Sequence, residues 1–377
     1  MRSRFAFIVG GTKWNSITYV DCFSGPWNTQ SEKFEDSSFS IALDELRKAR
    51  DSLKKRGLEL KLRCFFIEKS KSAYTRLERF AKETTDAEIA TRNSGFEKAI
   101  PDILEFIKAG GRRNFAFIFI DPTGWTGFAM KTIQPLLKVQ PGEVLINFMT
   151  RHIRRFYESP QEAHRESFEQ LFGKGEMPVE VSGLSKEDRD DALVRAYMRN
   201  VKKSGGFNHV CTAIVLSPLE DSAHFHLIYA TRDPKGVEVF KAAEKRAMEE
   251  MKGLRAEAQK RKRTERDQQD ELSLFGPGDD PMPLHFKQLR DRYLSKVKAA
   301  TRQRLEKRGT VPYDDAWTYA LAAPLIWDQD FKQWLNEWQK EGLLSIPELK
   351  PPKRVPKLGV GMTLVWQSRV RPPSDED

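Results

Sequence analysis

The stretch Asn114-Phe-Ala-Phe-Ile-Phe-Ile-Asp121-Pro-Thr-Gly-Trp125 decides the fold class of this chain of 377 residues. Its apolar run does not alternate with polar residues, which is typical of a strand covered on both faces in a parallel sheet. The run ends abruptly in a carboxylate, a proline and a glycine turn. Ligands bind outside the carboxyl ends of such strands, so Asp121, Pro122 and Trp125 are predicted to lie at a site.

Two earlier segments also end a β-rich run in polar residues. Ile17-Thr-Tyr-Val-Asp21 is followed by Cys-Phe-Ser-Gly25, where a glycine would let the backbone approach a ligand closely. Leu62-Arg-Cys-Phe-Phe-Ile-Glu68 ends in an acid at the place where a nucleoside-binding α/β sheet carries its ribose-binding carboxylate. Each motif alone is compatible with an ordinary strand end, whereas three in this order, separated by helical stretches, favour a binding edge.

Strand and helix patterns alternate through the first half of the chain. Apolar spacing predicts helices at 37–57, 70–85, 96–109 and 131–139, and strands at 88–93 and 143–149. Such alternation predicts an α/β fold with a right-handed, doubly wound, Rossmann-like sheet. The segment from 150 to 206 is rich in charged helical patterns and predicts an insertion, after which strands at 209–218 and 224–231 are predicted to form a hairpin.

Turn-forming residues between 274 and 283 indicate a domain boundary. Beyond it, helices are predicted at 286–302, 313–322 and 329–341, followed by two short strands around the basic, proline-rich loop 350–358. Three helices and such a wing predict a winged-helix domain. The expected organisation is a Rossmann-like domain at 1–240 with a helical insertion at 150–206, a charged helix and linker at 241–280, and a winged-helix-like domain at 281–377.

The formal net charge of +10 favours a polyanionic partner, and its distribution says more than the total. Between residues 351 and 373 there is no acid, and the basic residues are Lys353, Arg354, Lys357, Arg369 and Arg371. This bias predicts that the wing binds DNA or RNA, although winged-helix modules also serve protein contacts. The charged segment 241–271 mixes both signs and is better explained as a solvated helix than as a nucleic-acid patch.

Other classes of protein receive no support from the sequence. No stretch reaches the roughly 18 to 20 apolar residues that span a bilayer, and the apolar run near the N-terminus is too short for a secretion signal. Cys22, Cys64 and Cys211 lie far apart in strand-like runs, which favours reduced thiols in a cytoplasm. His224 and His226 have no third ligand nearby in sequence, so no metal site is expected.

Four of these motifs together resemble a known family. The segments 19–26, 65–68, 119–125 and 143–149, the last followed by Arg154-Arg-Phe156, look like the three-Cys-motif partner protein family, and the similarity extends from about Ser16 to Trp366. That family is similar to class I, Rossmann-like S-adenosylmethionine methyltransferases. Its members are found in bacteria and mobile elements beside a radical-SAM-like protein that carries a three-cysteine motif. The resemblance implies S-adenosylmethionine as cofactor and that protein as a partner.

The resemblance also implies roles for individual residues. The cofactor pocket is expected to comprise Asp21, Phe23, Gly25, Glu68 and the turn from Thr91 to Gly95 with Ser94 and Gly95, while Asp121, Pro122 and Trp125 face the target atom. Two positions depart from the pattern. Trp27 stands where the family's first motif often has a second glycine, and Pro122 is followed by Thr123 and Gly124, whereas amino-methylating enzymes that act on flipped bases carry a second proline and an aromatic. Trp125 either stacks on a base or plugs the end of the sheet.

Three functions are therefore compatible with the sequence, in this order of preference. The first is an S-adenosylmethionine-dependent methyltransferase acting on nucleic acid. The second is a catalytically degenerate, methyltransferase-like partner subunit of the radical-SAM-like protein, and the third is a nucleic-acid-binding protein without catalysis. The cluster of Arg151, Arg154 and Arg155 fits either phosphates or the acidic helices of the insertion.

Overall fold

The computed structural model describes residues 14–25, 37–122, 128–150, 153, 162–173, 183–217, 219–220, 222–267, 284–349 and 356–367. The chain divides into two compact units. The first comprises residues 1–210 with 223–236, and the second comprises 211–222 with 237–377. This division does not test the domain boundaries expected from the sequence, which remain a prediction.

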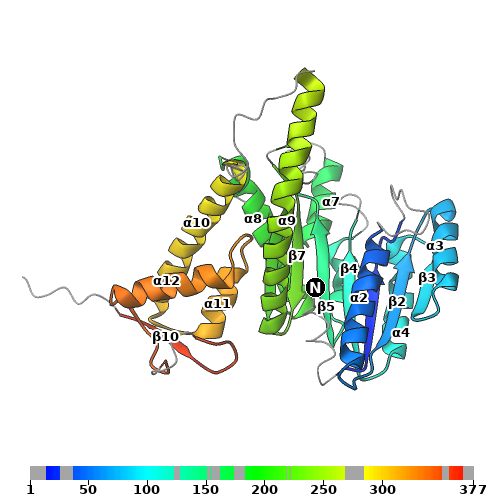
Figure 1. Cartoon of the computed structure of the whole chain (residues 1–377), viewed down its shortest axis with the longest axis horizontal. Helices are drawn as coiled ribbons and strands as arrows, with labels where there is room; N and C mark the ends of the chain where they lie inside the picture. Colours follow the sequence, from blue (N-terminus) through cyan, green and yellow to red (C-terminus); the bar gives the residue numbers. More distant parts are fainter. Residues whose placement is uncertain are drawn as a thin grey trace, which may run out of the picture. The chain divides into compact units, whose positions relative to one another are not determined.

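A seven-stranded sheet provides the strands of the first unit, and most of the edge strand that follows residue 208 is assigned to the second unit. Its strands are β1 (Ser16–Asp21), β2 (Lys61–Ile67), β3 (Glu88–Arg92), β4 (Asn114–Ile120), β5 (Gly142–Phe148), β6 (His209–Leu216) and β7 (Ala223–Thr231). They lie in the order β3-β2-β1-β4-β5-β7-β6, which Figure 1 shows from β3 in blue to β7 in green. The pairs from β3 to β5 are parallel and β7 runs antiparallel to β5. This is a doubly wound, mostly parallel α/β sheet, so the predicted α/β class is confirmed.

Helices α2 (Ser38–Lys54), α3 (Lys71–Glu83), α4 (Phe96–Ala109) and α5 (Met130–Leu137) connect the parallel strands. Successive side chains of a strand point to opposite faces, and β2 shows both. Leu62, Cys64 and Phe66 join a buried cluster with α2 and with Leu77 of α3. The alternate residue Phe65 packs its ring 5.4 Å from that of Phe106 in α4. The central strands are therefore covered on both faces.

The strand quoted at the outset is covered unevenly. Ala116, Ile118 and Ile120 of β4 are fully buried, whereas the phenylalanines between them are half-buried. The aromatic rings of Phe117 and Tyr19 stack across neighbouring strands at 6.2 Å. The uninterrupted apolar run thus gives one tightly filled face and one looser aromatic face.

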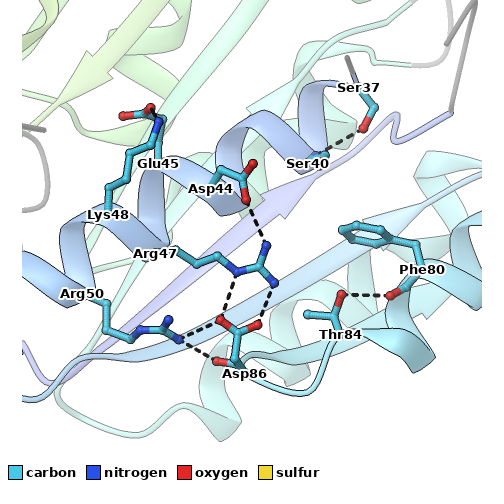
Figure 2. Close-up of polar contacts among 10 residues, drawn as sticks. All are labelled: Ser37, Ser40, Asp44, Glu45, Arg47, Lys48, Arg50, Phe80, Thr84 and Asp86. Atoms are coloured by element: carbon cyan, nitrogen blue, oxygen red, sulfur yellow. Dashed lines mark hydrogen bonds and ion pairs between the residues drawn. The ribbon is translucent and has the colours of Figure 1, made fainter. Parts of the chain in front are cut away.

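A surface ion-pair cluster fixes α2 against the connection between α3 and β3 (Figure 2). Asp86 lies in that connection and accepts two hydrogen bonds from the guanidinium of Arg47, at 3.0 and 2.6 Å. Arg50, nearly one turn further along α2, donates to the carboxylate and to the backbone carbonyl of Asp86. Because the Arg47 contact is bidentate, it sets the direction as well as the distance of the connection.

The remaining helices of the first unit are α7 (Glu162–Phe172) and α8 (Lys186–Gly205), which occupy the predicted insertion. Tyr197 of α8 stacks on Phe148 at the end of β5, with ring centroids 4.5 Å apart. Arg232 follows β7 and donates to the carbonyls of Leu137 and Gly205, so that it ties α5 and α8 to the sheet.

The second unit contains α9 (Pro234–Asp267), α10 (Leu284–Arg308), α11 (Tyr313–Leu321) and α12 (Asp328–Lys340) with a small sheet. Its strands are β8 (Thr310–Pro312), β9 (Leu344–Ser345) and β10 (Thr363–Trp366), ordered β8-β10-β9 and antiparallel. The two predicted wing strands are β9 and β10, and the sequence did not predict β8. Buried aromatic residues of α11 and α12 fill this unit, among them Trp317, Phe331 and Trp338.

A buried ion pair joins α9 to the turn between α11 and α12. Lys241 contacts Glu244 in the next turn of α9 and donates to the carbonyl of Ala323 at 2.8 Å. Glu244 in turn accepts the backbone N–H of Leu325 at 2.9 Å. Both charged groups are therefore satisfied by partners as well as by each other, which buried ions require. Among the described residues, every helix is too short or too polar to cross a bilayer.

Candidate functional site at the carboxyl edge of the sheet

Asp21 ends β1 and is completely buried. Its Oδ1 accepts the backbone N–H of Phe23 at 3.1 Å, and its Oδ2 accepts the hydroxyls of Ser38 at 2.9 Å and Tyr19 at 3.4 Å. Burial raises the pKa of Asp21 to about 6, while the hydrogen bonds from Phe23 and Ser38 oppose that rise. Because it accepts the N–H of Phe23 two residues on, the Asp21 carboxylate shapes the turn after β1.

Ser24 links that turn to the next strand. Its backbone N–H donates to the carbonyl of Ile67 at 2.8 Å, and its hydroxyl donates to the carbonyl of Asp21 at 2.7 Å. The same hydroxyl accepts the N–H of Ile67 at 3.2 Å. Sequence reasoning quoted Ser24 within its motif but gave it no role. These contacts connect the ends of β1 and β2, where the cofactor was expected.

Glu68 follows β2 and is 4% exposed. Its Oε1 accepts the backbone N–H of Ser70 at 2.5 Å, and its own N–H donates to the carbonyl of Arg92 at the end of β3. The side chain of Asn93 donates to the carbonyl of Glu68 at 2.8 Å. Within the described part of the chain, the Oε2 atom has no hydrogen bond. Glu68 is thus fixed through its backbone and one oxygen, with a second oxygen left for a donor.

The other expected cofactor residues surround these two acids. Phe23 packs its ring 5.2 Å from that of Phe96, the first residue of α4. Ser94 and Gly95 are half-buried in the turn before α4, and Gly95 is the residue that caps this helix. A Cβ atom built on Gly95 would meet nothing within 4 Å, so there is open space beside this turn. Gly25 is also half-buried.

Asp121 and Asn147 form the polar pair at the ends of β4 and β5. Ile120 pairs in register with Ile146, which brings the two following residues side by side. Nδ2 of Asn147 donates to Oδ1 of Asp121 at 2.5 Å. Burial raises the pKa of Asp121 and the Asn147 hydrogen bond opposes the rise. The negative charge of Asp121 also raises the pKa of Asp21, so the two carboxylates interact electrostatically.

Asn147 is the functional candidate that sequence reasoning missed. The side chain is 7% exposed, and its Oδ1 is buried with no hydrogen-bond partner among the described residues. The segment Glu143 to Met149 was recognised as a strand, but the position of its asparagine opposite Asp121 follows only from the strand register. Pro122, the residue after Asp121, is buried.

Several predicted residues cannot be placed. Trp125, Trp27, Arg151, Arg154 and Arg155 lie outside the described residues. In the wing, Lys357 is exposed, while Lys353, Arg354, Arg369 and Arg371 fall outside the described ranges. Cys22, Cys64 and Cys211 are buried thiols. Where the structure describes the chain, no group of three His, Cys, Asp or Glu side chains is arranged to hold a metal ion.

No protein-family model and no curated protein matches this chain. Among the solved structures that are similar to it, three of low identity illustrate the range. A Legionella pneumophila protein of the family model DUF519 is 10% identical, with 67% of this chain and 88% of that chain covered and a TM-score of 0.36. The cyclopropane synthase of Mycobacterium tuberculosis is 11% identical over 70% and 74%, with a TM-score of 0.27. A loganic acid methyltransferase with SAH is 11% identical over 70% and 86%, with a TM-score of 0.28. Such scores are too low to carry a functional argument, so the assignment of the fold rests on the strand order.

Proposed function

We propose that this protein is an S-adenosylmethionine-dependent methyltransferase that acts on nucleic acid. The observation that supports it best is the set of polar groups along one edge of the sheet. Glu68 follows β2, Asp21 ends β1, Asp121 follows β4 and Asn147 lies near the end of β5, and these four parallel strands are neighbours in the order β2-β1-β4-β5. In open α/β sheets the carboxyl edge at the reversal of strand order is where nucleotide-like ligands bind.

The residues at the β1 and β2 ends fit such a cofactor. Glu68 has one carboxylate oxygen held by Ser70 and a second oxygen facing no described donor, which suits a ribose hydroxyl. The open space beside Gly95 gives room for a ligand close to the backbone. Phe23 supplies an apolar surface, and Asp21 holds the turn that carries it. When bound, the sulfonium cofactor supplies an electrophilic methyl group.

The substrate half of the proposal depends on the second unit. Its helices α10, α11 and α12 and its antiparallel sheet follow one another in the order of a winged-helix domain. Helix α12 carries Asp328, Asp330 and Glu337 against Lys332 and Lys340, so its formal charge is −1. An acidic helix repels phosphates. We therefore assign nucleic-acid binding to the basic loop and C-terminal segment, of which the exposed Lys357 is the described member.

A second candidate function is a methyltransferase-like partner subunit without its own catalysis, beside the three-Cys-motif radical-SAM-like protein that the sequence resemblance implies. The observation that favours it is the carboxylate of Asp21, which is fully buried and already accepts three hydrogen bonds, from Tyr19, Phe23 and Ser38. Trp27 in place of a glycine points the same way. In this case the strand-end acids would stabilise the fold.

Calorimetric titration of the full chain with S-adenosylmethionine tests the cofactor half. Saturable binding with one site per chain supports the methyltransferase, and the same titration with S-adenosylhomocysteine is the companion measurement. The absence of heat and of any thermal shift at millimolar cofactor would overturn the methyltransferase proposal and leave the partner subunit.

A further inference from the structure

We propose that Asn147 is a substrate-positioning residue, which fixes Asp121 through its Nδ2 and accepts a hydrogen bond from an amino group of the methyl acceptor through its Oδ1. This inference rests on the proposed function and adds the chemical class of the acceptor group. Nothing in the sequence motifs distinguishes Asn147 from the other residues of its strand. The inference comes from its hydrogen bonds.

The contact with Asp121 fixes the orientation of the Asn147 side-chain amide. Nδ2 lies 2.5 Å from Oδ1 of Asp121, a distance at which two oxygens would repel each other. The donor end of the amide must therefore face the carboxylate. The acceptor end is then committed to another direction, where the described residues offer it no donor. Because the side chain is 93% buried, this acceptor is shielded from bulk water as well.

The Oδ1 of Asn147, unpaired among the described residues, is available to a ligand. Buried acceptors in proteins are nearly always paired, so an orphaned one at a strand end indicates a ligand donor. It adjoins Asp121, which is half-buried and whose Oδ2 has no hydrogen bond among the described contacts. Two neighbouring acceptors without their own donors suit a group that carries two hydrogens. A primary amino group on a base has two N–H donors, whereas a hydroxyl or a thiol has one.

Asp121 and Asn147 can together support methyl transfer to an amino nitrogen. Methylation of an amino nitrogen forms one N–C bond, breaks one C–S bond whose electron pair stays on sulfur, and releases one proton from nitrogen. Asp121 is placed to accept that proton through its second oxygen, and the Asn147 hydrogen bond to the first oxygen opposes the rise in pKa that burial causes. Asn147 would hold the second hydrogen and thereby orient the lone pair of the nitrogen.

The test uses the full chain with two variants and one matched control. Asn147→Leu removes both polar atoms at similar size, and Asn147→Ser is a milder change in case the first fails to fold. Asn114→Leu is the control, because Asn114 is also a buried amide but lies at the opposite end of β4, where it binds Thr18 and the Ile107 carbonyl. Three quantities are measured: the affinity for S-adenosylmethionine, methyl transfer to single-stranded oligonucleotides, and the pKa of Asp121 by carbon NMR.

We expect oligonucleotides with adenine or cytosine to be N-methylated, and the same sequences with hypoxanthine or uracil, which lack the amino group, to be inert. Asn147→Leu should raise the KM for the oligonucleotide by at least about 10-fold, the loss expected for one buried hydrogen bond to a substrate. It should also raise the pKa of Asp121, while cofactor affinity stays unchanged. Asn114→Leu should lower stability alone.

Different failures have different meanings. Methylation on carbon, oxygen or sulfur, or no methylation of any oligonucleotide by a protein that binds the cofactor, overturns the amino-group assignment but leaves the cofactor site standing. If the protein binds no cofactor, the proposed function fails. In that case the positioning role falls with it, and an unchanged pKa of Asp121 in Asn147→Leu would show in addition that the amide does not hold the carboxylate.

Discussion

The backbone N–H of Ser70 donates to Oε1 of Glu68 at 2.5 Å, at the point where β2 gives way to α3. The first turn of a helix has unpaired N–H groups that favour an anion, and Ser70 is the N-cap residue of α3. The contact therefore holds one oxygen of the carboxylate in place and leaves the other without a described partner. This arrangement follows from the helix boundary, and in the proposed function the second oxygen would accept a ribose hydroxyl.

Replacing Glu68 should weaken the binding of S-adenosylmethionine. We expect Glu68→Ala to raise the dissociation constant by roughly 10- to 100-fold, because a hydrogen bond to a charged group contributes about 1.5 to 3 kcal/mol. Calorimetry of the full chain measures it, and the exposed Glu59→Ala provides a control with the same loss of charge. Equal affinity in the Glu68 variant and the wild type would remove this residue from the cofactor site.

Asp121 should be needed for methyl transfer and dispensable for folding. We expect Asp121→Ala to lower the transfer rate by about 100-fold or more, as is usual when a positioned proton acceptor is lost, with the circular dichroism spectrum and the cofactor affinity retained. Because burial raises the pKa of Asp121, wild-type activity should fall as the pH drops through that raised value. A variant that does not fold would show instead that Asp121 caps the strand.

The sequence pattern predicted those helices and strands well that are long enough to show a complete apolar repeat. Helix α4 spans 96–109 as its apolar spacing and the glycines after it indicate. Phe39, Leu43, Leu46 and Leu53 lie on the buried face of α2, and their spacing is the apolar period by which the helix was predicted. Strand β8, by contrast, has only three residues and owes its existence to β10, which pairs with it from more than 50 positions away. A strand that short has no period to detect.

The candidate site was predicted in part for the same reason. The strand-end acids are visible in the sequence because each follows its own apolar run. The roles of Ser24, Ser38 and Asn147 depend on partners in other elements: Ser38 reaches Asp21 across 17 positions and Asn147 reaches Asp121 across 26. Such pairings are set by the strand order and register, which a single sequence does not specify.

Asp86 should stabilise the first unit modestly through Arg47 and Arg50. Hydrogen bonds from Arg47 above all lower the pKa of Asp86 to about 2, below its ordinary value of 3.8. Its contribution is therefore complete above pH 4 and is lost as the pH falls toward 2. Since the group is partly exposed, we expect Asp86→Asn to lower the free energy of unfolding by only about 0.5 to 1 kcal/mol at neutral pH.

Urea unfolding at low and high salt measures the Asp86 effect. Glu45→Gln is the control, because Glu45 pairs with Lys48 within the same helix and has no polar contact to a second element among the described residues. We expect this control to change stability less than Asp86→Asn does. An equal effect from both variants would mean that the bidentate contact in Figure 2 adds nothing beyond an ordinary surface pair.

Asp21 should make the protein less stable as the pH rises. Its folded-state pKa of about 6 lies above the ordinary 3.8, so the folded state favours the protonated form. Stability from this group is complete below pH 4 and is lost as the pH rises through 6, by about 3 kcal/mol for a fully buried carboxyl. Asp21→Asn cannot titrate, so its stability relative to the wild type should increase over that range. Urea unfolding at pH 4.5 and 7.5 measures the difference, and no relative gain would contradict the assignment.

The last prediction concerns the basic segment of the second unit. Lys353, Arg354, Lys357, Arg369 and Arg371 stand together without an acid, and the neighbouring α12 has a formal charge of −1. Phosphate contacts release counterions, so the affinity of the full chain for DNA or RNA should fall steeply with salt. Replacing Lys353, Arg354 and Lys357 with alanine should lower the slope of log affinity against log salt by about 2 to 3, at 0.7 to 0.9 for each contact.

Fluorescence anisotropy with labelled DNA and RNA of unrelated sequences measures this effect. The losses should be alike across sequences, because phosphate contacts position a protein without reading bases. The control replaces Lys54, Lys55 and Lys108, three exposed lysines of the first unit, and changes the net charge equally. A similar loss in both triple variants would reduce the effect to net charge. Wild-type binding that is absent at low salt or independent of salt would assign this segment to protein contacts, and thereby favour the partner subunit.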